Sequence, residues 1–229
     1  MNDKELVAIE AAKRVKNGMV VGLGTGSTAN YFIEHLAKRQ AEGGLNISTV
    51  ASSTISAMKA ESCGLKVVSI AQLKRIDLYV DGADEITPNL SLLKGRGQDL
   101  VMEKLLAKAA DQFIVVADKS KLVSRIGEKF IIPIEVIPSA WQMVKHQLEK
   151  QGAHGDIRLN AGKDNVVISA HGSYVLDMQF PVKINDEALN NLLNNTPGIV
   201  EHGVFYGIAS QVLIADNGII EVMGAQKPL

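Results

Sequence analysis

Short apolar runs alternate with amphipathic stretches along the first half of the chain. The apolar runs have the length and composition of buried strands, whereas the amphipathic stretches repeat their apolar residues at helical spacing. The predicted helices cover residues 3–16, 29–42, 53–64 and 98–110, and the predicted strands cover 19–23, 46–52, 66–70, 76–80 and 112–118. This alternation is typical of a mainly parallel sheet covered by helices.

The pattern changes near residue 128. Proline-punctuated and alternating segments predict strands at 129–138, 155–159, 165–170, 174–180 and 199–206, with helices at 140–152 and 185–198. This order resembles a β-α-β-β-α-β unit with one added strand. Residues 210–223 read as a hairpin across Asn217-Gly218 that returns to the first sheet. We therefore predict a Rossmann-like domain from residues 1–127 plus 206–229, and an inserted smaller ferredoxin-like α/β domain from residues 128–205.

Composition narrows the classes of function. The chain carries 24 basic and 25 acidic residues, a formal net charge of −1, so it has no global field for nucleic acid or an anionic membrane. Cys63 is the single cysteine, which fits a reducing compartment. The charged N-terminus does not read as a secretory signal, and no apolar run approaches the ~20 residues that span a bilayer. We expect a cytoplasmic protein.

A glycine-rich turn, Gly22 to Thr28, joins the first predicted strand to the second helix. Such a turn exposes backbone N–H groups at the positive end of a helix, and Ser27 and Thr28 add hydroxyls. It favours a phosphate monoester. The dinucleotide fingerprint does not fit, because its last glycine is Ser27 here and the next strand ends without an acid. A simple tight turn with Ser/Thr caps remains the alternative.

An acidic turn follows the predicted strand 76–80, with Asp81, Asp84 and Glu85 within five positions. Parallel sheets present ligands at the carboxyl ends of their strands, so these acids favour a functional site. The alternatives are an Asp-rich turn with a helix cap, and a Mg²⁺ site for which other ligands are lacking.

A basic loop, Lys94-Gly95-Arg96-Gly97, comes next, and Glu103 follows it on a predicted helix. Two glycines beside two cations indicate a loop that approaches a ligand closely. Taken alone, Glu103 is typical of a solvated helix glutamate. Lys121, which follows the strand 112–118, is placed to reach an anion.

Together these segments resemble the ribose-5-phosphate isomerase type A family. The resemblance is carried by residues 24–28, 81–85, 94–97 and 103–104, by Lys121, by "PIEVIP" at 133–138 and by the C-terminal "NGII". It runs over nearly the whole chain. It implies a Rossmann-like domain with an inserted α/β domain, and the interconversion of D-ribose 5-phosphate and D-ribulose 5-phosphate in the non-oxidative branch of the pentose phosphate pathway.

The resemblance also implies the roles of individual residues. Glu103 is the base that moves a proton between C2 and C1 through an enediolate, and Lys94 stabilises the oxyanion. Asp81 opens the sugar ring, and Asp84 holds hydroxyls or polarises the carbonyl. The substrate-binding residues are Thr25, Gly26, Ser27, Thr28, Asp81, Gly82, Ala83, Asp84, Lys94, Gly95, Arg96, Gly97, Lys121 and Lys4. No metal and no nicotinamide is required, and the family forms homodimers or homotetramers.

One position departs from the family pattern, and two rival functions remain. The family loop is usually Lys-Gly-Gly-Gly, so Arg96 would cost about 1 kcal/mol or more if its position needed a positive φ. A non-catalytic sugar-phosphate-binding regulator of the same fold would bind without exchanging the C2 proton. A nucleotide-dependent dehydrogenase would bind nicotinamide, which the missing acid after the second strand disfavours.

Overall fold

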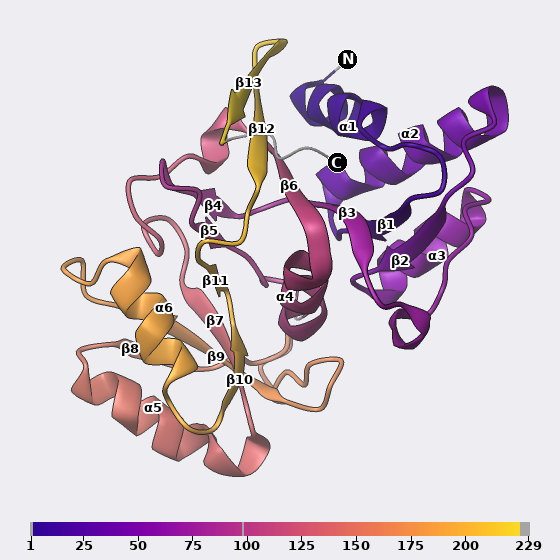
Figure 1. Cartoon of the computed structure of the whole chain (residues 1–229). Helices are drawn as coiled ribbons and strands as arrows, with labels where there is room; N and C mark the ends of the chain where they lie inside the picture. The colour runs from indigo at the N-terminus through magenta and orange to yellow at the C-terminus, as the bar shows by residue number, and fades with distance from the viewer. Residues whose placement is uncertain (1, 98, 225–229) are drawn as a thin grey trace. The chain divides into compact units, whose positions relative to one another are not determined.

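The structure is a computed structural model that describes residues 2–97 and 99–224 and has an α/β fold (Figure 1). The chain divides into two compact units. The first unit comprises Met1–Ala83, Met102–Lys121 and Ile208–Leu229, and the second comprises Asp84–Val101 and Leu122–Gly207. The first contains a mainly parallel sheet, and the second contains two antiparallel sheets. The predicted fold class is confirmed.

A six-stranded sheet forms the centre of the first unit, in the order β13-β12-β6-β3-β1-β2. All neighbouring pairs are parallel except β12 and β13, which form the predicted hairpin. Asn217 and Gly218 turn this hairpin with φ values of 51° and 84°, a conformation that asparagine and glycine tolerate. The strands are β1 Val20–Leu23, β2 Ser48–Ala51, β3 Ile76–Asp81, β6 Ala110–Asp118, β12 Gln211–Asp216 and β13 Ile219–Met223.

Helices pack on this sheet through small and aliphatic side chains. In Figure 1, α1 lies beside α2, and α1 also contacts β6 and β12. Their buried residues, among them Val7, Ala8, Phe32 and Ile33, form one core with Leu78 of β3. The helices are α1 Asp3–Lys13, α2 Ser27–Gly43, α3 Thr54–Ser62 and α4 Leu100–Ala109, with short 3₁₀ turns at Ile70–Gln72 and Lys119–Lys121.

The second unit holds a four-stranded antiparallel sheet, β10-β7-β9-β8, and a three-stranded sheet, β11-β5-β4. The helices of this unit bury Val144, Leu148, Leu189 and Leu193 in a core with the strand residues. The strands are β4 Glu85–Ile86, β5 Leu92–Leu93, β7 Ile132–Val136, β8 His154–Ile157, β9 Tyr174–Gln179, β10 Ile199–His202 and β11 Val204–Phe205; the helices are α5 Trp141–Lys150 and α6 Asp186–Asn194, with a 3₁₀ turn at Pro138–Ala140.

Several local predictions were wrong. Residues 66–70 and 165–170 are not strands, because each makes only isolated bridges with its neighbours. The predicted irregular loop 87–97 contains β5. The predicted strand 199–206 splits into β10 and β11, which belong to different sheets. Gly203 lies at this break, where a Cβ would overlap the Lys94 carbonyl, so the chain can turn there only without a side chain.

The two compact units do not coincide with the predicted domain ranges. The second unit begins at Leu122 rather than at residue 128, and it also takes up Asp84–Val101, which the prediction gave to the first domain. The short strands β4 and β5 explain this difference, because they pair with β11 of the second unit. The domain ranges themselves stay a prediction.

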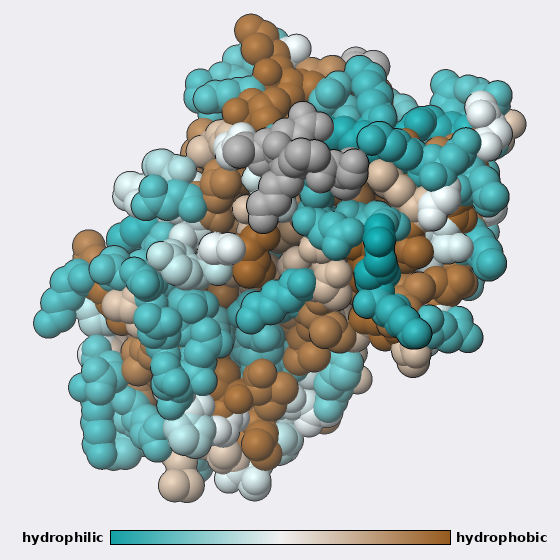
Figure 2. Space-filling model, in the orientation of Figure 1, coloured by the Kyte–Doolittle hydropathy of each residue, from teal (hydrophilic) through white to brown (hydrophobic). Residues whose placement is uncertain are grey.

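Two further observations concern the exposed apolar residues and the character of the helices. Apolar atoms gather on the β12–β13 hairpin in Figure 2, where Ile219 and Val222 are exposed. Within residues 2–97 and 99–224, no helix has the length and apolar character needed to cross a membrane.

Candidate active site

The glycine-rich turn is held tightly against the end of β3. Gly24 donates its N–H to the Val80 carbonyl at 2.9 Å, and a Cβ on Gly24 would overlap the Asp81 carboxylate. Gly26 precedes α2 with a φ of 116°, which favours glycine. The absence of side chains at these two positions therefore lets the turn pass directly over Asp81.

Thr25 points its hydroxyl into the protein. Its Oγ1 lies 2.9, 2.7 and 3.0 Å from the Oγ atoms of Ser52, Ser53 and Ser56, at the start of α3. Ser56 Oγ also donates to the Gly24 carbonyl at 2.7 Å. These hydrogen bonds fix the position of the glycine-rich turn relative to the start of α3. Sequence reasoning did not single out these serines, since nothing in their spacing relates them to Thr25.

The cationic end of the first unit comprises Lys4 and Lys121, and Lys4 contacts Ser27 there. Lys4 Nζ donates to Ser27 Oγ at 3.1 Å, which connects α1 to the glycine-rich turn. Burial opposes ionisation of Asp118, but hydrogen bonds from Ser120 and the charges of Lys121 and Lys4 hold the pKa of its carboxyl below the usual value. Both lysines thus act on one carboxylate beside the turn.

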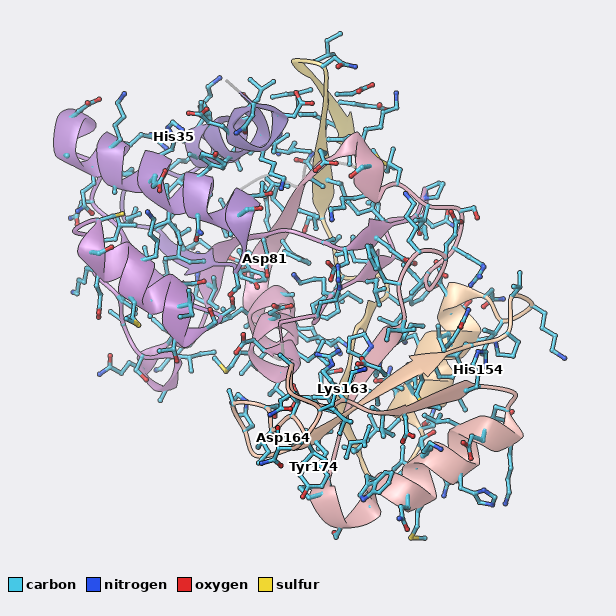
Figure 3. All side chains as sticks on the ribbon, turned by 180° about the vertical axis from the view of Figure 1, so that it is seen from behind. His35, Asp81, His154, Lys163, Asp164 and Tyr174 are labelled. Atoms are coloured by element: carbon cyan, nitrogen blue, oxygen red, sulfur yellow. The ribbon has the colours of Figure 1, made fainter. Side chains whose placement is uncertain are left out.

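Asp81 ends β3 and is fully buried (labelled in Figure 3). Its Oδ1 accepts from the backbone N–H groups of Thr25 at 3.0 Å and Gly82 at 2.7 Å. Its Oδ2 accepts from the Tyr79 hydroxyl at 2.5 Å. These donors fix the orientation of the carboxylate.

Glu103 lies one turn into α4 and is 5% exposed, so it is not the solvated surface charge that its sequence alone would indicate. Burial raises the pKa of the Tyr79 hydroxyl well above its usual value, and the charges of Asp81 and Glu103 raise it further. The fold therefore gathers two of the predicted catalytic carboxylates around one hydroxyl. Sequence reasoning missed Tyr79, although its spacing of two from Asp81 places both side chains on one face of a strand.

The remaining acids of the turn belong to the second unit. Asp84 donates its N–H to the Leu93 carbonyl at 2.8 Å, and its Oδ1 lies 3.8 Å from Arg96 Nη1. Glu85 is fully buried and accepts from the N–H groups of Gly127, Lys129 and Phe130 at 2.6, 2.6 and 2.8 Å. Glu85 therefore holds the 127–130 loop, and its role is structural.

The predicted basic loop is also placed within the second unit. Lys94 is 4% exposed, donates its N–H to the Gly203 carbonyl at 2.9 Å, and has its Nζ 5.7 Å from the centre of the Phe205 ring. Gly95 has a φ of 90°, and a Cβ there would overlap Leu100. The position that requires glycine is thus 95.

Arg96 replaces a glycine of the family pattern without backbone strain. The described non-glycine residues with positive φ are Leu90, Lys163 and Asn217, so Arg96 is not among them. Its guanidinium lies 4.3 Å from the centre of the Phe130 ring, and its carbonyl accepts from Arg158 at 3.2 Å. The expected cost of a positive φ is therefore not incurred, and Gly97 follows as an exposed residue.

The two units divide the predicted site residues between them. The first unit contains Lys4, residues 25–28, residues 81–83, Glu103 and Lys121, and the second contains Asp84 and residues 94–97. Within the first unit, Thr25 of the turn and Tyr79 both donate to Asp81, and the charge of Glu103 acts on the Tyr79 hydroxyl. Among the residues that the structure describes, no three His, Cys, Asp or Glu side chains are grouped so that they could hold a metal ion.

Comparison with known proteins identifies the family. The model of the family described as ribose 5-phosphate isomerase A (phosphoriboisomerase A) matches residues 48–218. The chain belongs to this family. It is 44% identical over 223 residues to the ribose-5-phosphate isomerase A of Methanothermobacter thermautotrophicus, covering 97% of this chain and 98% of that protein. It is also 44% identical over 213 residues to the ribose-5-phosphate isomerase A of Thermococcus kodakarensis, covering 92% and 93% of the two chains.

Solved structures agree with this family membership. The ribose 5-phosphate isomerase A of Methanocaldococcus jannaschii superimposes with a TM-score of 0.91 at 38% identity, over 97% of this chain and 98% of that one. A D-ribose-5-phosphate isomerase in complex with phospho-erythronic acid gives a TM-score of 0.93 at 37% identity, over 98% and 100% of the two chains. Both units of this chain are therefore covered by structures of the family.

Proposed function

We propose that this chain interconverts D-ribose 5-phosphate and D-ribulose 5-phosphate through an enediolate. The observation that carries the proposal is the pair of buried carboxylates, Asp81 and Glu103, gathered around the Tyr79 hydroxyl in a chain of the ribose 5-phosphate isomerase A family. An aldose and a ketose differ only in where a proton and a carbonyl lie. Such a reaction needs a positioned base and donors for the developing charge, and it involves no net electron transfer.

Glu103 is the base that removes the proton from C2 and returns it to C1. A carboxylate on a helix, buried from solvent, has a fixed orientation and a weakened hydration shell, both of which favour proton abstraction from carbon. Lys94 supplies the positive charge that stabilises the oxyanion of the enediolate. It is buried although it is a lysine, which is unusual for a residue without a task.

Asp81 transfers the proton that opens the furanose ring, and Asp84 binds the sugar hydroxyls. Asp81 suits this role because two backbone N–H groups and a hydroxyl hold its carboxylate in one orientation. Gly82 and Ala83 lie between the two acids and contribute backbone groups. Gly95, Arg96 and Gly97 bind the substrate from the basic loop.

The phosphate binds at the cationic end of the first unit. Gly26, Ser27 and Thr28 offer backbone and hydroxyl donors at the start of α2, and Lys4 and Lys121 supply charge. Thr25 contributes through the orientation of the turn, because its N–H donates to Asp81 and its hydroxyl is engaged by the serines at the start of α3. A cytoplasmic homodimer or homotetramer is part of this proposal, and light scattering coupled to size-exclusion chromatography measures its subunit number.

Solvent exchange tests the proposal most directly. Purified protein in D₂O should convert ribose 5-phosphate to ketose and place deuterium on carbon without added cofactor, and EDTA should leave the rate unchanged. Glu103→Gln should lower kcat by roughly 10²–10⁴-fold and leave KM largely unchanged. Lys108→Gln, on the exposed end of the same helix, is the matched control. Binding without exchange would instead identify a sugar-phosphate-binding regulator.

A further inference from the structure

Tyr79 is a buried polar residue to which the proposed mechanism gives no task. It precedes Asp81 by two positions on β3, so the two side chains lie on the same face of the sheet. Its hydroxyl donates to Asp81 Oδ2 at 2.5 Å, and its ring stacks on Phe113 with the ring centres 5.0 Å apart. A Cβ on Gly22 would overlap the Tyr79 ring, so the neighbouring strand also leaves space for it.

The Tyr79 hydroxyl connects Asp81 to the glycine-rich turn. Ser52 also makes a hydrogen bond to this hydroxyl, and Ser52 Oγ lies 2.9 Å from Thr25 Oγ1. Thr25 in turn donates its backbone N–H to Asp81 Oδ1. The result is a closed set of hydrogen bonds in which Tyr79 holds one carboxylate oxygen and the turn holds the other.

Tyr79 acts as a neutral donor in this set. Burial raises the pKa of its hydroxyl well above the usual value, and the charges of Asp81 and Glu103 raise it further. The hydroxyl therefore keeps its proton over the working pH range. A neutral donor beside two carboxylates orients the one that it contacts without adding a charge of its own.

We propose that Tyr79 is a positioning residue for Asp81, and that its hydrogen bond holds the carboxylate in the orientation needed for the proton transfer that opens the sugar ring. The proposal rests on the role given to Asp81 in the proposed function. The Tyr79 hydroxyl is engaged by Asp81 and Ser52, so it acts through Asp81.

Tyr79→Phe tests this role, because it removes only the hydroxyl and keeps the ring that stacks on Phe113. We expect kcat from ribose 5-phosphate to fall about tenfold with KM within about twofold, as for the loss of one hydrogen bond to a charged group. Tyr31→Phe is the control: it removes a hydroxyl that contacts only the Asn2 amide in the described hydrogen bonds, and should change neither quantity.

Substrate choice separates ring opening from the later proton transfer. Ribulose 5-phosphate has its O5 phosphorylated and cannot close a furanose onto C2, so solvent deuterium exchange at C1 proceeds without the ring-opening step. Tyr79→Phe should therefore slow isomerisation of ribose 5-phosphate about tenfold while leaving this exchange within about twofold of wild type. Equal losses in both assays would place Tyr79 on the enediolate step and overturn the proposal.

A further substitution keeps the test decisive if Tyr79→Phe does not fold. Site-specific 3-fluorotyrosine at position 79 retains the hydroxyl as a stronger donor, and it should change kcat from ribose 5-phosphate by more than about twofold while leaving exchange at C1 of ribulose 5-phosphate unchanged. An unchanged kcat from ribose 5-phosphate in either folded variant would overturn the role of Tyr79. Absence of isomerase activity in the unmodified chain would overturn the proposed function instead, so the two failures are distinguishable.

Discussion

Asp81 and Glu85 lie four residues apart and are both fully buried, yet they serve different regions of the molecule. Asp81 belongs to the first unit and takes its donors from the glycine-rich turn, its own backbone and a tyrosine hydroxyl. Glu85 belongs to the second unit and accepts from three backbone N–H groups of the 127–130 loop. Burial and hydrogen bonding by themselves therefore do not distinguish a catalytic carboxylate from a structural one.

The two carboxylates differ in the groups that surround them. Asp81 is held by a turn that also carries the predicted phosphate-binding groups, so its environment belongs to a ligand site. Glu85 satisfies backbone N–H groups that would otherwise be buried without an acceptor, which stabilises a loop. This contrast predicts that removing the charge of Asp81 harms turnover, whereas removing the charge of Glu85 harms folding.

Asp81→Asn should have the largest effect. We expect kcat from ribose 5-phosphate to fall by roughly 10²–10⁴-fold, because the amide cannot act as a base in ring opening. Rates over a range of substrate concentrations measure this, and the exposed Asp111→Asn serves as the control in the same sheet. Retention of more than a tenth of the wild-type kcat would remove Asp81 from the mechanism.

Glu85→Gln should lower the stability of the fold and leave turnover largely intact. The amide of glutamine would turn an N–H group toward the backbone donors of the 127–130 loop, at a cost of roughly 2–4 kcal/mol in the free energy of unfolding. Chemical denaturation followed by circular dichroism measures the loss, with the exposed Glu128→Gln as the control. Folded protein should keep kcat within about threefold of wild type, and a larger drop would show that Glu85 takes part in catalysis.

Glu135 offers a third buried carboxylate with yet another environment. It lies on β7 and is fully buried, and among the described residues neither of its carboxylate oxygens has a partner at standard hydrogen-bond geometry. Burial raises the pKa of Glu135, and the Ser169 hydroxyl, the Val101 N–H, the charge of His171 and the Ser173 hydroxyl offset this only in part.

The sign of its pH dependence follows from this raised pKa. Between the unfolded and folded pKa values of Glu135, the folded chain binds more protons, so stability falls as pH rises through that window. Glu135→Gln carries no titratable proton and should remove this fall. The variant should match the stability of wild type near pH 4 and exceed it at pH 8. Thermal unfolding across pH 4–8 measures the difference, and Glu149→Gln on α5 should leave the wild-type slope unchanged.

Arg96→Ala should have the smallest effect. It removes a stacking contact with Phe130 and a 3.8 Å pairing with Asp84 from a side chain that is 55% exposed, which contributes about 0.5–1 kcal/mol to stability. We expect KM for ribose 5-phosphate to stay within about threefold, since the backbone of the loop does the binding. A tenfold rise in KM would assign the guanidinium itself to the substrate.

Much of the fold was accessible from sequence because it depends on local patterns. Helical spacing, glycine stops and buried strand runs located the elements of the first unit to within a few residues. The pattern failed at residues 66–70 and 165–170, where β-branched residues occur but the neighbouring chain offers only single bridges. Strand formation depends on a neighbouring strand to pair with, and the sequence of the segment alone does not specify that neighbour.

The candidate site was predictable where glycine or charge marked it. The turn at 24–28 and the acids at 81–85 stand out because such residues are costly to bury without a reason. Tyr79 does not stand out, since a tyrosine in an apolar strand is typical of a packed core. Its hydrogen bond to Asp81 and the opposite roles of Asp81 and Glu85 depend on which groups surround each side chain after folding.

The amino-acid sequence by itself determined the alternation of elements, the family, and the positions of the carboxylates and cations that the chemistry needs. The tertiary structure decided which carboxylate is held for a ligand, which one stabilises a loop, and which hydroxyl joins the site. The physical reason is distance: helical and strand periodicity act over a few residues, whereas hydrogen bonds join Tyr79, Ser52, Thr25 and Asp81 across strands that the chain visits far apart.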